Sequence, residues 1–380
     1  MTREISWQTK KTVRPENNFQ TKSILLTLKE RQFGFGIIGA GTISDIHAMA
    51  INAIPAAKLY GVYSINKNKS QAFADKYHCT SYDSLQELAA DPAIDIVCIC
   101  TPSGIHLDPA IACIEGGKHC MIEKPLEVTL EKCDQIIEAA QKTGVKVGVI
   151  FPSRFYESAK QLKSAIEQNR FGDMVLGDAY VKWSRSEAYY GSAAWRGTWQ
   201  LDGGGALMNQ GIHSVDLLQW YMGPVKSVQA MAANRKHKGI EVEDTVVSTI
   251  QFVNGALGTI ECSTAVYPGT FKRIEIMGSA GTAILEESNL VKWQFEKGAG
   301  DDEKILQSMS ASNTSGGGVS NPADISFAGH QRQLEDMMES ITTGKEPLVD
   351  GVEGRKAVEI VLAIYESARL GRRVDLPISV

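Results

Sequence analysis

The side chain with the clearest chemical potential in this sequence is the amine of Lys124, in the tripeptide Glu123-Lys124-Pro125. When burial or a neighbouring positive charge lowers its pKa toward neutrality, a lysine can take the proton of a hydroxyl group while a hydride leaves the same carbon. Pro125 restricts Lys124 to extended backbone angles and is compatible with a cis peptide bond. A lysine at the end of a strand is also a common surface charge, so the tripeptide alone leaves both interpretations open.

A second group of polar side chains lies in the segment 203–216, which reads Gly-Gly-Gly-Ala-Leu-Met-Asn-Gln-Gly-Ile-His-Ser-Val-Asp. Asn209 and His213 are four residues apart and therefore share one face of a helix. On the wall of a cleft, the amide and the imidazole can hydrogen-bond adjacent sugar hydroxyls, and the imidazole can also relay a proton. The alternative is a hydrogen-bonded structural histidine beside a helix cap.

Aromatic and basic residues cluster in the stretch before these glycines. They are Trp183, Arg185, Trp195, Arg196 and Trp199. Aromatic faces stack on sugar rings, and arginines bind hydroxyls, carboxylates or phosphates; core tryptophans with surface arginines are the alternative. Arg154 and His330 are further candidates for substrate contact. No group of His, Cys and acidic residues has the spacing of metal ligands, so no metal site is predicted.

Residues 39–44, Gly-Ala-Gly-Thr-Ile-Ser, lie between an apolar run and a helical pattern. Gly39 permits a tight turn, and Gly41 allows the backbone to approach a pyrophosphate. The main chain of Thr42 and Ile43 would then present free N–H groups at the positive end of a helix. The pattern therefore predicts a dinucleotide site, although an ordinary turn between a strand and a helix is the alternative.

The second strand of this region ends in the sequence Ser64-Ile65-Asn66-Lys67-Asn68-Lys69, which contains no acidic residue. An acid at this point binds the ribose hydroxyls of NAD. Ser64 can instead donate to a 2′-phosphate, and Lys67 or Lys69 can neutralise it, which favours NADP over NAD. Lysines on a solvated surface are the alternative.

Strand-like and helix-like patterns alternate between residues 33 and 150. The expected strands are 35–38, 58–63, 95–100, 119–122 and 145–150, and 130–143 is an expected helix. This alternation predicts an α/β fold, a doubly wound parallel sheet with helices on both faces. Ligands bind beyond the carboxyl ends of such strands, which is where Lys124 would lie.

From residue 151 the pattern predicts an α+β domain on a mostly antiparallel open sheet with helices on one side. The expected strands are 175–183, 245–252, 256–262, 272–277, 282–286 and 290–295, the expected helices are 158–168, 207–222, 331–342 and 354–370, and 308–321 is an expected loop. We therefore divide the chain into an N-terminal extension (1–32), a dinucleotide-binding domain (33–150) and a substrate-binding domain (151–380).

Composition limits the classes of partner. The net charge of −5 argues against binding to nucleic acid or to an anionic membrane, and no apolar run approaches the roughly 20 residues that a membrane helix needs. The seven cysteines are odd in number and contain no Cys-x-x-Cys pair, which is typical of reduced thiols in a cytoplasmic protein.

Together these motifs resemble the family of glucose–fructose oxidoreductase, inositol dehydrogenase and rhizopine-catabolism proteins, the Gfo/Idh/MocA family. The resemblance covers about residues 33–376. It rests on the glycine turn at 39–44, Thr101-Pro102-Ser103 with His106, Glu123-Lys124-Pro125, the segment 203–216 and Gly-Val-Glu-Gly-Arg-Lys-Ala at 351–357.

The resemblance implies a Rossmann domain followed by an α/β domain whose open sheet often mediates homodimers or homotetramers. It implies that Lys124 is the principal acid/base residue, that a cis peptide bond precedes Pro125, and that His213 positions the reacting hydroxyl and assists proton transfer. The residues implied to line the cofactor are Thr101, Pro102, His106 and Glu123.

One position departs from the family pattern. Many members carry aspartate where this chain has Asn209, and an amide cannot act as a base, so a Lys–Asp–His relay is in doubt. The form Asn-Gln-Gly-Ile-His resembles branches that act on carbon 3 of sugars or nucleotide sugars, and residues 64–69 resemble those of members that prefer NADP.

The motifs thus lead us to expect an NAD(P)-dependent oxidoreductase that moves a hydride to or from a secondary alcohol carbon of a sugar, cyclitol or sugar derivative. Lys124, His213 and Asn209 would serve the reaction, and Lys124, Arg154, Trp195, Arg196, Asn209, His213 and His330 would contact the substrate. The alternatives are a glycosidase that uses bound NAD for transient oxidation and a non-catalytic dinucleotide-sensing regulator.

Overall fold

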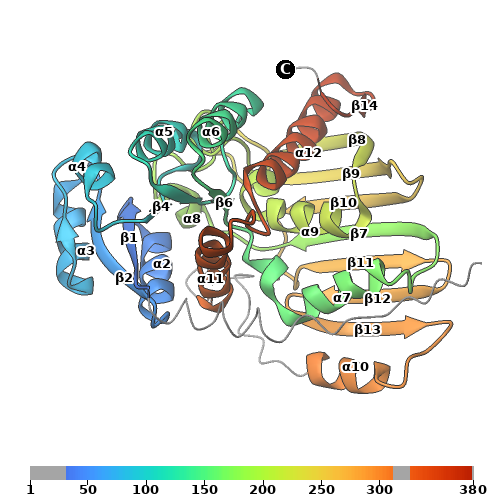
Figure 1. Ribbon diagram of the computed structural model, residues 1–380. Coiled ribbons are helices and arrows are strands. Elements are labelled where there is room, and N and C mark those ends of the chain that lie inside the picture. The colour runs from blue at the N-terminus through green and yellow to red at the C-terminus, as the bar shows by residue number, and fades with distance from the viewer. Residues whose placement is uncertain (1–30, 311–325, 379–380) are drawn as a thin grey trace, which may run out of the picture.

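The computed structural model describes residues 31–310 and 326–378 (Figure 1). Apart from Arg31 and Gln32, the expected extension 1–32 lies outside the described residues, as do residues 311–321 of the expected loop. The first three residues of that loop were predicted wrongly, because Ser308–Ser310 form the end of helix α10 (Asp302–Ser310).

The N-terminal half folds on a six-stranded parallel sheet with the order β3-β2-β1-β4-β5-β6. Its strands are β1 (Phe33–Ile38), β2 (Ala57–Tyr63), β3 (Thr80–Ser81), β4 (Ile96–Ile99), β5 (His119–Ile122) and β6 (Val147–Val149). Every residue of β1 and β4 is buried. Alternate residues of β4 belong to two separate cores, Val97 and Ile99 to one and Ile96 and Cys98 to the other. The predicted doubly wound sheet, covered on both faces, is confirmed.

Helices connect these strands and cover the sheet (Figure 1). They are α2 (Thr42–Asn52), α3 (Lys67–Tyr77), α4 (Leu85–Ala90), α5 (Leu107–Glu115) and α6 (Leu130–Thr143). The sequence of α6 contains both of its end signals: the Thr129 hydroxyl accepts from the Lys132 N–H, and Gly144 follows the helix in the left-handed conformation at φ 77°.

The C-terminal half folds on an eight-stranded sheet with the order β13-β12-β11-β7-β10-β9-β8-β14. Its strands are β7 (Met174–Lys182), β8 (Val225–Ala233), β9 (Thr245–Phe252), β10 (Leu257–Ser263), β11 (Arg273–Gly278), β12 (Gly281–Glu286), β13 (Asn289–Phe295) and β14 (Val374–Asp375). Only β7 and β10 pair in parallel in this sheet, so the expectation of a mostly antiparallel sheet is confirmed. The sequence analysis did not predict β8 or β14.

One face of this second sheet is covered by helices α7 (Glu157–Glu167), α9 (Ile212–Met222) and α12 (Gly351–Leu370), and the other face is open (Figure 1). Strand β9 shows the predicted alternation, because Val246 and Ile250 are buried whereas Val247 is exposed. Met231 and Leu257 are also exposed. The second sheet therefore has an amphipathic, one-sided construction.

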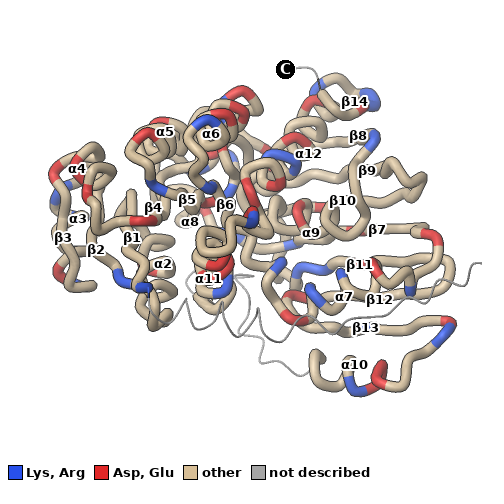
Figure 2. The backbone as a smooth tube through the Cα atoms, in the orientation of Figure 1, with Lys and Arg blue, Asp and Glu red and all other residues tan. Residues whose placement is uncertain are grey.

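The C-terminal helices join the two halves. Helix α11 (Ala328–Thr343) packs against α2, and α12 packs against α6, β6 and β8. Figure 2 shows Lys and Arg interspersed with Asp and Glu along the described chain. All seven cysteines are unpaired. Among the described residues, no helix is long and apolar enough to cross a membrane.

Candidate active site

The glycine turn after β1 leaves open space in front of helix α2. Gly39 has φ 107°, and a Cβ there would stand 2.6 Å from the carbonyl oxygen of Cys100, so the turn requires glycine. Gly41 precedes the helix, and a Cβ on it would meet no protein atom within 4 Å. The main chain of Thr42 and Ile43 forms the first turn of α2, whose N–H groups have no partner within the helix. This geometry fits the pyrophosphate of a dinucleotide.

The residues expected near the adenosine ribose follow strand β2. The Ser64 hydroxyl accepts from the main-chain N–H of Asn66, and Asn66 in turn caps helix α3. Lys67 forms an exposed ion pair of 2.7 Å with Asp83, whereas Lys69 projects from the first turn of α3 and is exposed. Of these two lysines, Lys69 is therefore the better placed to meet a phosphate.

His106 ties together the loops that follow β4 and β5. The imidazole is fully buried, with Nδ1 2.9 Å from the Pro125 carbonyl oxygen and Nε2 3.0 Å from that of Thr101. Burial lowers the pKa of His106. This ring therefore holds the edge of the cofactor site in shape rather than facing a ligand, while Thr101 and Pro102 remain partly exposed at that edge.

Glu123 lies at the centre of a buried cluster with His47 and His330. Its Oε1 atom is 2.9 Å from His47 Nε2 and 3.7 Å from His330 Nε2, and its Oε2 atom accepts from the Lys124 main-chain N–H at 3.2 Å. Burial raises the pKa of Glu123, but hydrogen bonds with His330 and His47 outweigh burial and leave it well below its ordinary value. The atoms of these three side chains that could bind a metal ion lie within 4.8 Å of one another. The spacing of residues in the sequence does not reveal this group, because 76 residues separate His47 from Glu123.

Lys124 follows strand β5, and the Lys124–Pro125 peptide bond is cis, as expected. Its Nζ atom donates to the main-chain carbonyl oxygen of Asn209 at 2.7 Å. Burial lowers the pKa of Lys124; the charges of Glu123 and Asp202 oppose this effect, and that of Arg196 reinforces it. The environment of Lys124 therefore favours a neutral amine more than water does.

Asn209 belongs to a π-helical turn, Ala206–Gly211, that leads directly into α9. The expected single helix from 207 to 222 is thus two elements, and the wider turn aims the carbonyl of Asn209 at Lys124. The turn is anchored by Glu243, whose carboxylate accepts from the N–H groups of Gly205 and Leu207 at 2.9 Å. These hydrogen bonds join residues 36 and 38 positions apart in the sequence, so the periodicity of the sequence could not predict them.

The structure adds Asp202, a carboxylate that sequence analysis missed. It is 2% exposed, accepts from Asn209 Nδ2 at 2.6 Å and from the Gly197 N–H at 2.9 Å. Burial raises the pKa of Asp202, and the positive charge of Lys124 is among the groups that lower it. The acid that many relatives carry at the position of Asn209 is thus present here one side chain away; its only signal was its place directly before the three glycines.

His213 lies in the first turn of α9, and its ring stacks edge-on against Phe151 at a centroid distance of 5.7 Å. Burial lowers the pKa of His213 well below its ordinary value, and the positive charges of Lys124 and Lys272 lower it further. The imidazole is therefore neutral near pH 7. The charge of Lys124 affects the pKa of both His213 and Asp202, so both groups lie within electrostatic range of Lys124.

Three other predicted contacts lie in different surroundings. Arg154 is 1% exposed, and its guanidinium is held by Asp216 (2.6 and 2.8 Å) and Glu353 (3.0 Å), so we do not keep it as a substrate contact. His330 is buried against Glu123. The guanidinium carbon of Arg196 lies over the Trp195 ring, 4.6 Å from the ring centroid.

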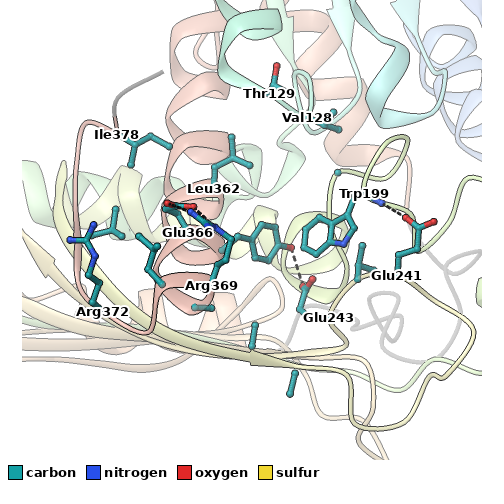
Figure 3. Close-up of a pocket in the computed structure, with 18 of the residues that line it drawn as sticks. Val128, Thr129, Trp199, Glu241, Glu243, Leu362, Glu366, Arg369, Arg372 and Ile378 are labelled. Carbon is teal, nitrogen blue, oxygen red and sulfur yellow. Dashed lines mark hydrogen bonds and ion pairs between the residues drawn. The ribbon is translucent and has the colours of Figure 1, made fainter.

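A cavity of about 1350 Å³ lies on the other side of Glu243. Trp199, Glu243 and Arg369 extend toward it from different segments (Figure 3). Lys124, Asn209 and His213 are not among its lining residues. The chemistry that we describe therefore belongs to the residues around Lys124 and not to this cavity.

Comparison with protein families matches both halves of the chain. Residues 33–151 match the oxidoreductase family with an NAD-binding Rossmann fold, and residues 159–284 match the Gfo/Idh/MocA C-terminal domain. The uncharacterised oxidoreductase YrbE of Bacillus subtilis is 30% identical over 68% of this chain and 75% of its own length. The D-glucoside 3-dehydrogenase of Escherichia coli is 26% identical over 90% of this chain and 96% of its own length.

Among solved structures, the WlbA dehydrogenase of Bordetella pertussis, in complex with NADH and UDP-GlcNAcA, superposes with a TM-score of 0.83 at 32% identity. The superposition covers 92% of this chain and 99% of the WlbA chain. The two domains, the glycine turn and the lysine after β5 agree with the family matches. The chain belongs to the Gfo/Idh/MocA family of oxidoreductases.

Proposed function

We propose that this chain is an NAD(P)-dependent oxidoreductase that transfers a hydride between the nicotinamide and a secondary alcohol or ketone carbon of a sugar, cyclitol or sugar derivative. One observation supports this most strongly: the part-buried amine of Lys124 donates at 2.7 Å to the main-chain carbonyl oxygen of Asn209, within electrostatic range of His213 and beyond the carboxyl ends of the Rossmann strands. The relatives named for glucoside 3-oxidation and for a complex with UDP-GlcNAcA point to the same substrates.

The residues that fit the cofactor run along one edge of the parallel sheet. Gly39, Gly41, Thr42 and Ile43 would hold the pyrophosphate, as the open space at Gly41 allows. Ser64 and Lys69 would meet the adenosine ribose, and Thr101, Pro102, Glu123, Lys124 and Pro125 would lie toward the nicotinamide. When bound, the nicotinamide accepts or supplies the hydride. WlbA was solved with NADH, and the preference of this chain for NADP remains a prediction.

Lys124 would accept the hydroxyl proton during oxidation and return it during reduction. A neutral amine has two hydrogens and one lone pair, so it can keep donating to the Asn209 carbonyl oxygen while its lone pair faces the substrate. The carbonyl also stabilises the ammonium form that results. Protonation of Lys124 therefore requires no movement of the π-helical turn.

His213 and Asn209 would orient the substrate. The neutral imidazole can accept or donate one hydrogen bond, and its Nδ1 atom is buried and has no protein partner among residues 31–310 and 326–378. The Asn209 amide is fixed by Asp202, which leaves its side-chain oxygen to face a hydroxyl. Asp202 is a positioning residue: it holds the Asn209 amide, and its charge raises the pKa of Lys124.

Reduced nicotinamide formation provides the test. Polyols, cyclitols, glycosides and nucleotide sugars are screened by absorbance with NAD and NADP in parallel, and secondary alcohol oxidation on at least one of them is expected. Release of a sugar without net cofactor reduction would identify a glycosidase instead. Cofactor binding without turnover on any compound would identify a regulator.

We also propose that the chain forms a homodimer or homotetramer through the open face of the second sheet, where Met231, Val247 and Leu257 are exposed. Light scattering on the purified protein tests the mass of the particle. The seven unpaired cysteines support the proposal that the protein works in the cytoplasm, which cell fractionation tests.

A further inference from the structure

Two arginines flank one tyrosine beside the candidate active site. Tyr189 lies in the short helix α8 (Glu187–Gly191), with the guanidinium carbon of Arg196 4.4 Å and that of Arg185 5.3 Å from its ring centroid. The Tyr189 hydroxyl accepts from Arg196 at 2.7 Å and from Gln210 Nε2 at 2.9 Å. Hydrogen bonds and ring contacts of Tyr189 therefore hold the two guanidinium groups in place.

This cluster is connected to the catalytic groups through the main chain. Gln210 follows Asn209, whose carbonyl oxygen holds Lys124. The charge of Arg196 affects the pKa of Lys124 and that of Asp202, so Arg196 lies within electrostatic range of both. Arg196 therefore lies near the groups around which we propose that a sugar is oxidised.

The protein supplies no carboxylate partner for Arg196 among the described residues. None lies within 4.0 Å of its guanidinium, and its buried Nε–H group has no hydrogen-bond partner there. Asp202, a buried acid whose charge Arg196 also affects, is already engaged by Asn209 and Gly197. The Oε1 atom of Gln210 is also buried without a partner. Polar groups in such surroundings usually find a partner, which a ligand can provide.

Two positive charges lie close together in this cluster. Arg185 is 4% exposed, and burial lowers its pKa, an effect that the charge of Arg196 adds to. Two guanidinium groups held against the ring of one tyrosine repel each other and are stabilised by an anion. Planar guanidinium groups match carboxylate and phosphate oxygens in particular.

We propose that Arg196, supported by Arg185, binds an anionic group carried by the sugar substrate, a carboxylate or a phosphate, and makes the enzyme selective for acidic sugars. This inference rests on the proposed oxidoreductase function. It names the substrate class that the site takes and a residue that determines specificity.

Kinetics on matched substrates test the inference. Glucose, glucuronate, glucose 6-phosphate, UDP-GlcNAc and UDP-GlcNAcA are compared on the full-length protein, with NAD and with NADP. The first three differ only in a neutral, carboxylate or phosphate group at carbon 6, and the two nucleotide sugars separate a ring carboxylate from a diphosphate. Arg196→Gln is the test variant, and Arg31→Gln, at the opposite, amino-terminal edge of the parallel sheet, removes an equal charge as the control.

We expect kcat/KM for the preferred anionic compound to exceed that for its neutral counterpart by about tenfold or more, and Arg196→Gln to abolish most of that difference, mainly through KM. Arg31→Gln should leave the difference unchanged. A ratio that is the same in wild type and Arg196→Gln, or an equal loss on neutral and anionic compounds, overturns the inference while leaving the oxidoreductase function intact.

Binding measurements keep the test independent of turnover. Calorimetric titration with glucuronate, glucose 6-phosphate and UDP-GlcNAcA is carried out on wild type and Arg196→Gln in the presence of NAD. Weaker binding of an anion to the variant supports the inference even if no compound is oxidised. Failure to oxidise any compound would count only against the proposed oxidoreductase function. If none of the three anions binds to the wild type, the inference is overturned.

Discussion

The Nζ atom of Lys124 lies 2.7 Å from the main-chain carbonyl oxygen of Asn209. This hydrogen bond joins the loop after β5 of the Rossmann sheet to the π-helical turn before α9, so it fixes the distance between the proposed base and the residues that orient the substrate. Because the acceptor is a main-chain atom, its position depends on the fold of the turn and not on the identity of side chain 209. The position of Lys124 therefore does not depend on whether side chain 209 is an amide or a carboxylate.

The pH dependence of oxidation should reflect the lowered pKa of Lys124. Burial disfavours the ammonium form, so the neutral base becomes populated at a lower pH than in water. The rate of alcohol oxidation should rise with pH and level off at an apparent pKa below the usual lysine value of about 10.4. A profile of kcat/KM against pH checks this expectation, and a rise centred at the value for a free lysine would contradict it.

Asp202→Asn should change both the rate and the pH profile. The charge of Asp202 raises the pKa of Lys124, so its removal should move the rising limb of the oxidation profile to lower pH. We expect kcat to fall by about tenfold, because the Asn209 amide loses a charge-assisted hydrogen bond.

The matched control is Asp134→Asn, which removes an acid bonded to Arg355 away from the site. It should leave the position of the profile unchanged. If Asp202→Asn lowers kcat without moving the profile, Asp202 has only a structural role.

Two glycine substitutions separate cofactor binding from folding. Gly41→Ala adds a methyl group that meets no protein atom within 4 Å, so the melting temperature should change little while the Kd of the dinucleotide rises by about tenfold or more. Gly39→Ala places a methyl group 2.6 Å from the Cys100 carbonyl oxygen at φ 107° and should destabilise the fold itself. Fluorescence titration with NAD and thermal melting measure the two effects; unchanged affinity in Gly41→Ala would place the pyrophosphate elsewhere.

Arg154 was expected to contact the substrate, but in the structure it pairs with Asp216, and Arg154→Met tests how much this pair stabilises the fold. The variant leaves the Asp216 carboxylate, which is 0% exposed, without its partner and should lower the free energy of unfolding by about 3–5 kcal/mol. Arg31→Gln breaks an ion pair whose arginine is 52% exposed and should cost at most about 1 kcal/mol. Urea denaturation compares the two, and equal losses would argue that the Arg154 pair contributes no more than a surface contact.

The parts of the site that could be predicted from sequence are those that local rules place. Gly39 and Gly41 follow a fully apolar strand, and Lys124 follows another, so parallel-sheet topology brings both to the same edge. The alternation of Val246 and Ile250 with Val247 likewise predicted which face of β9 is buried. In each case the relevant signal lies within a few residues of the element that it describes.

The parts that could not be predicted depend on tertiary contacts. The place of Asp202 before three glycines does not show that it is buried against Asn209, and nothing in the sequence pairs Arg154 with Asp216 at a separation of 62 residues. The π-helical turn is held by Glu243 from 38 residues away, so a periodicity of 3.6 residues predicted one continuous helix there. His47, Glu123 and His330 meet only after three distant elements pack together.

The most direct test of the proposed mechanism is the rate of hydride transfer in Lys124→Ala, measured as absorbance of reduced nicotinamide on the best substrate of the wild-type protein, with and without added ethylamine. We predict a loss of about 10²-fold or more, partial recovery with ethylamine, and thermal melting that still shows a folded protein. A folded Lys124→Ala variant that oxidises the substrate at nearly the wild-type rate would contradict the account.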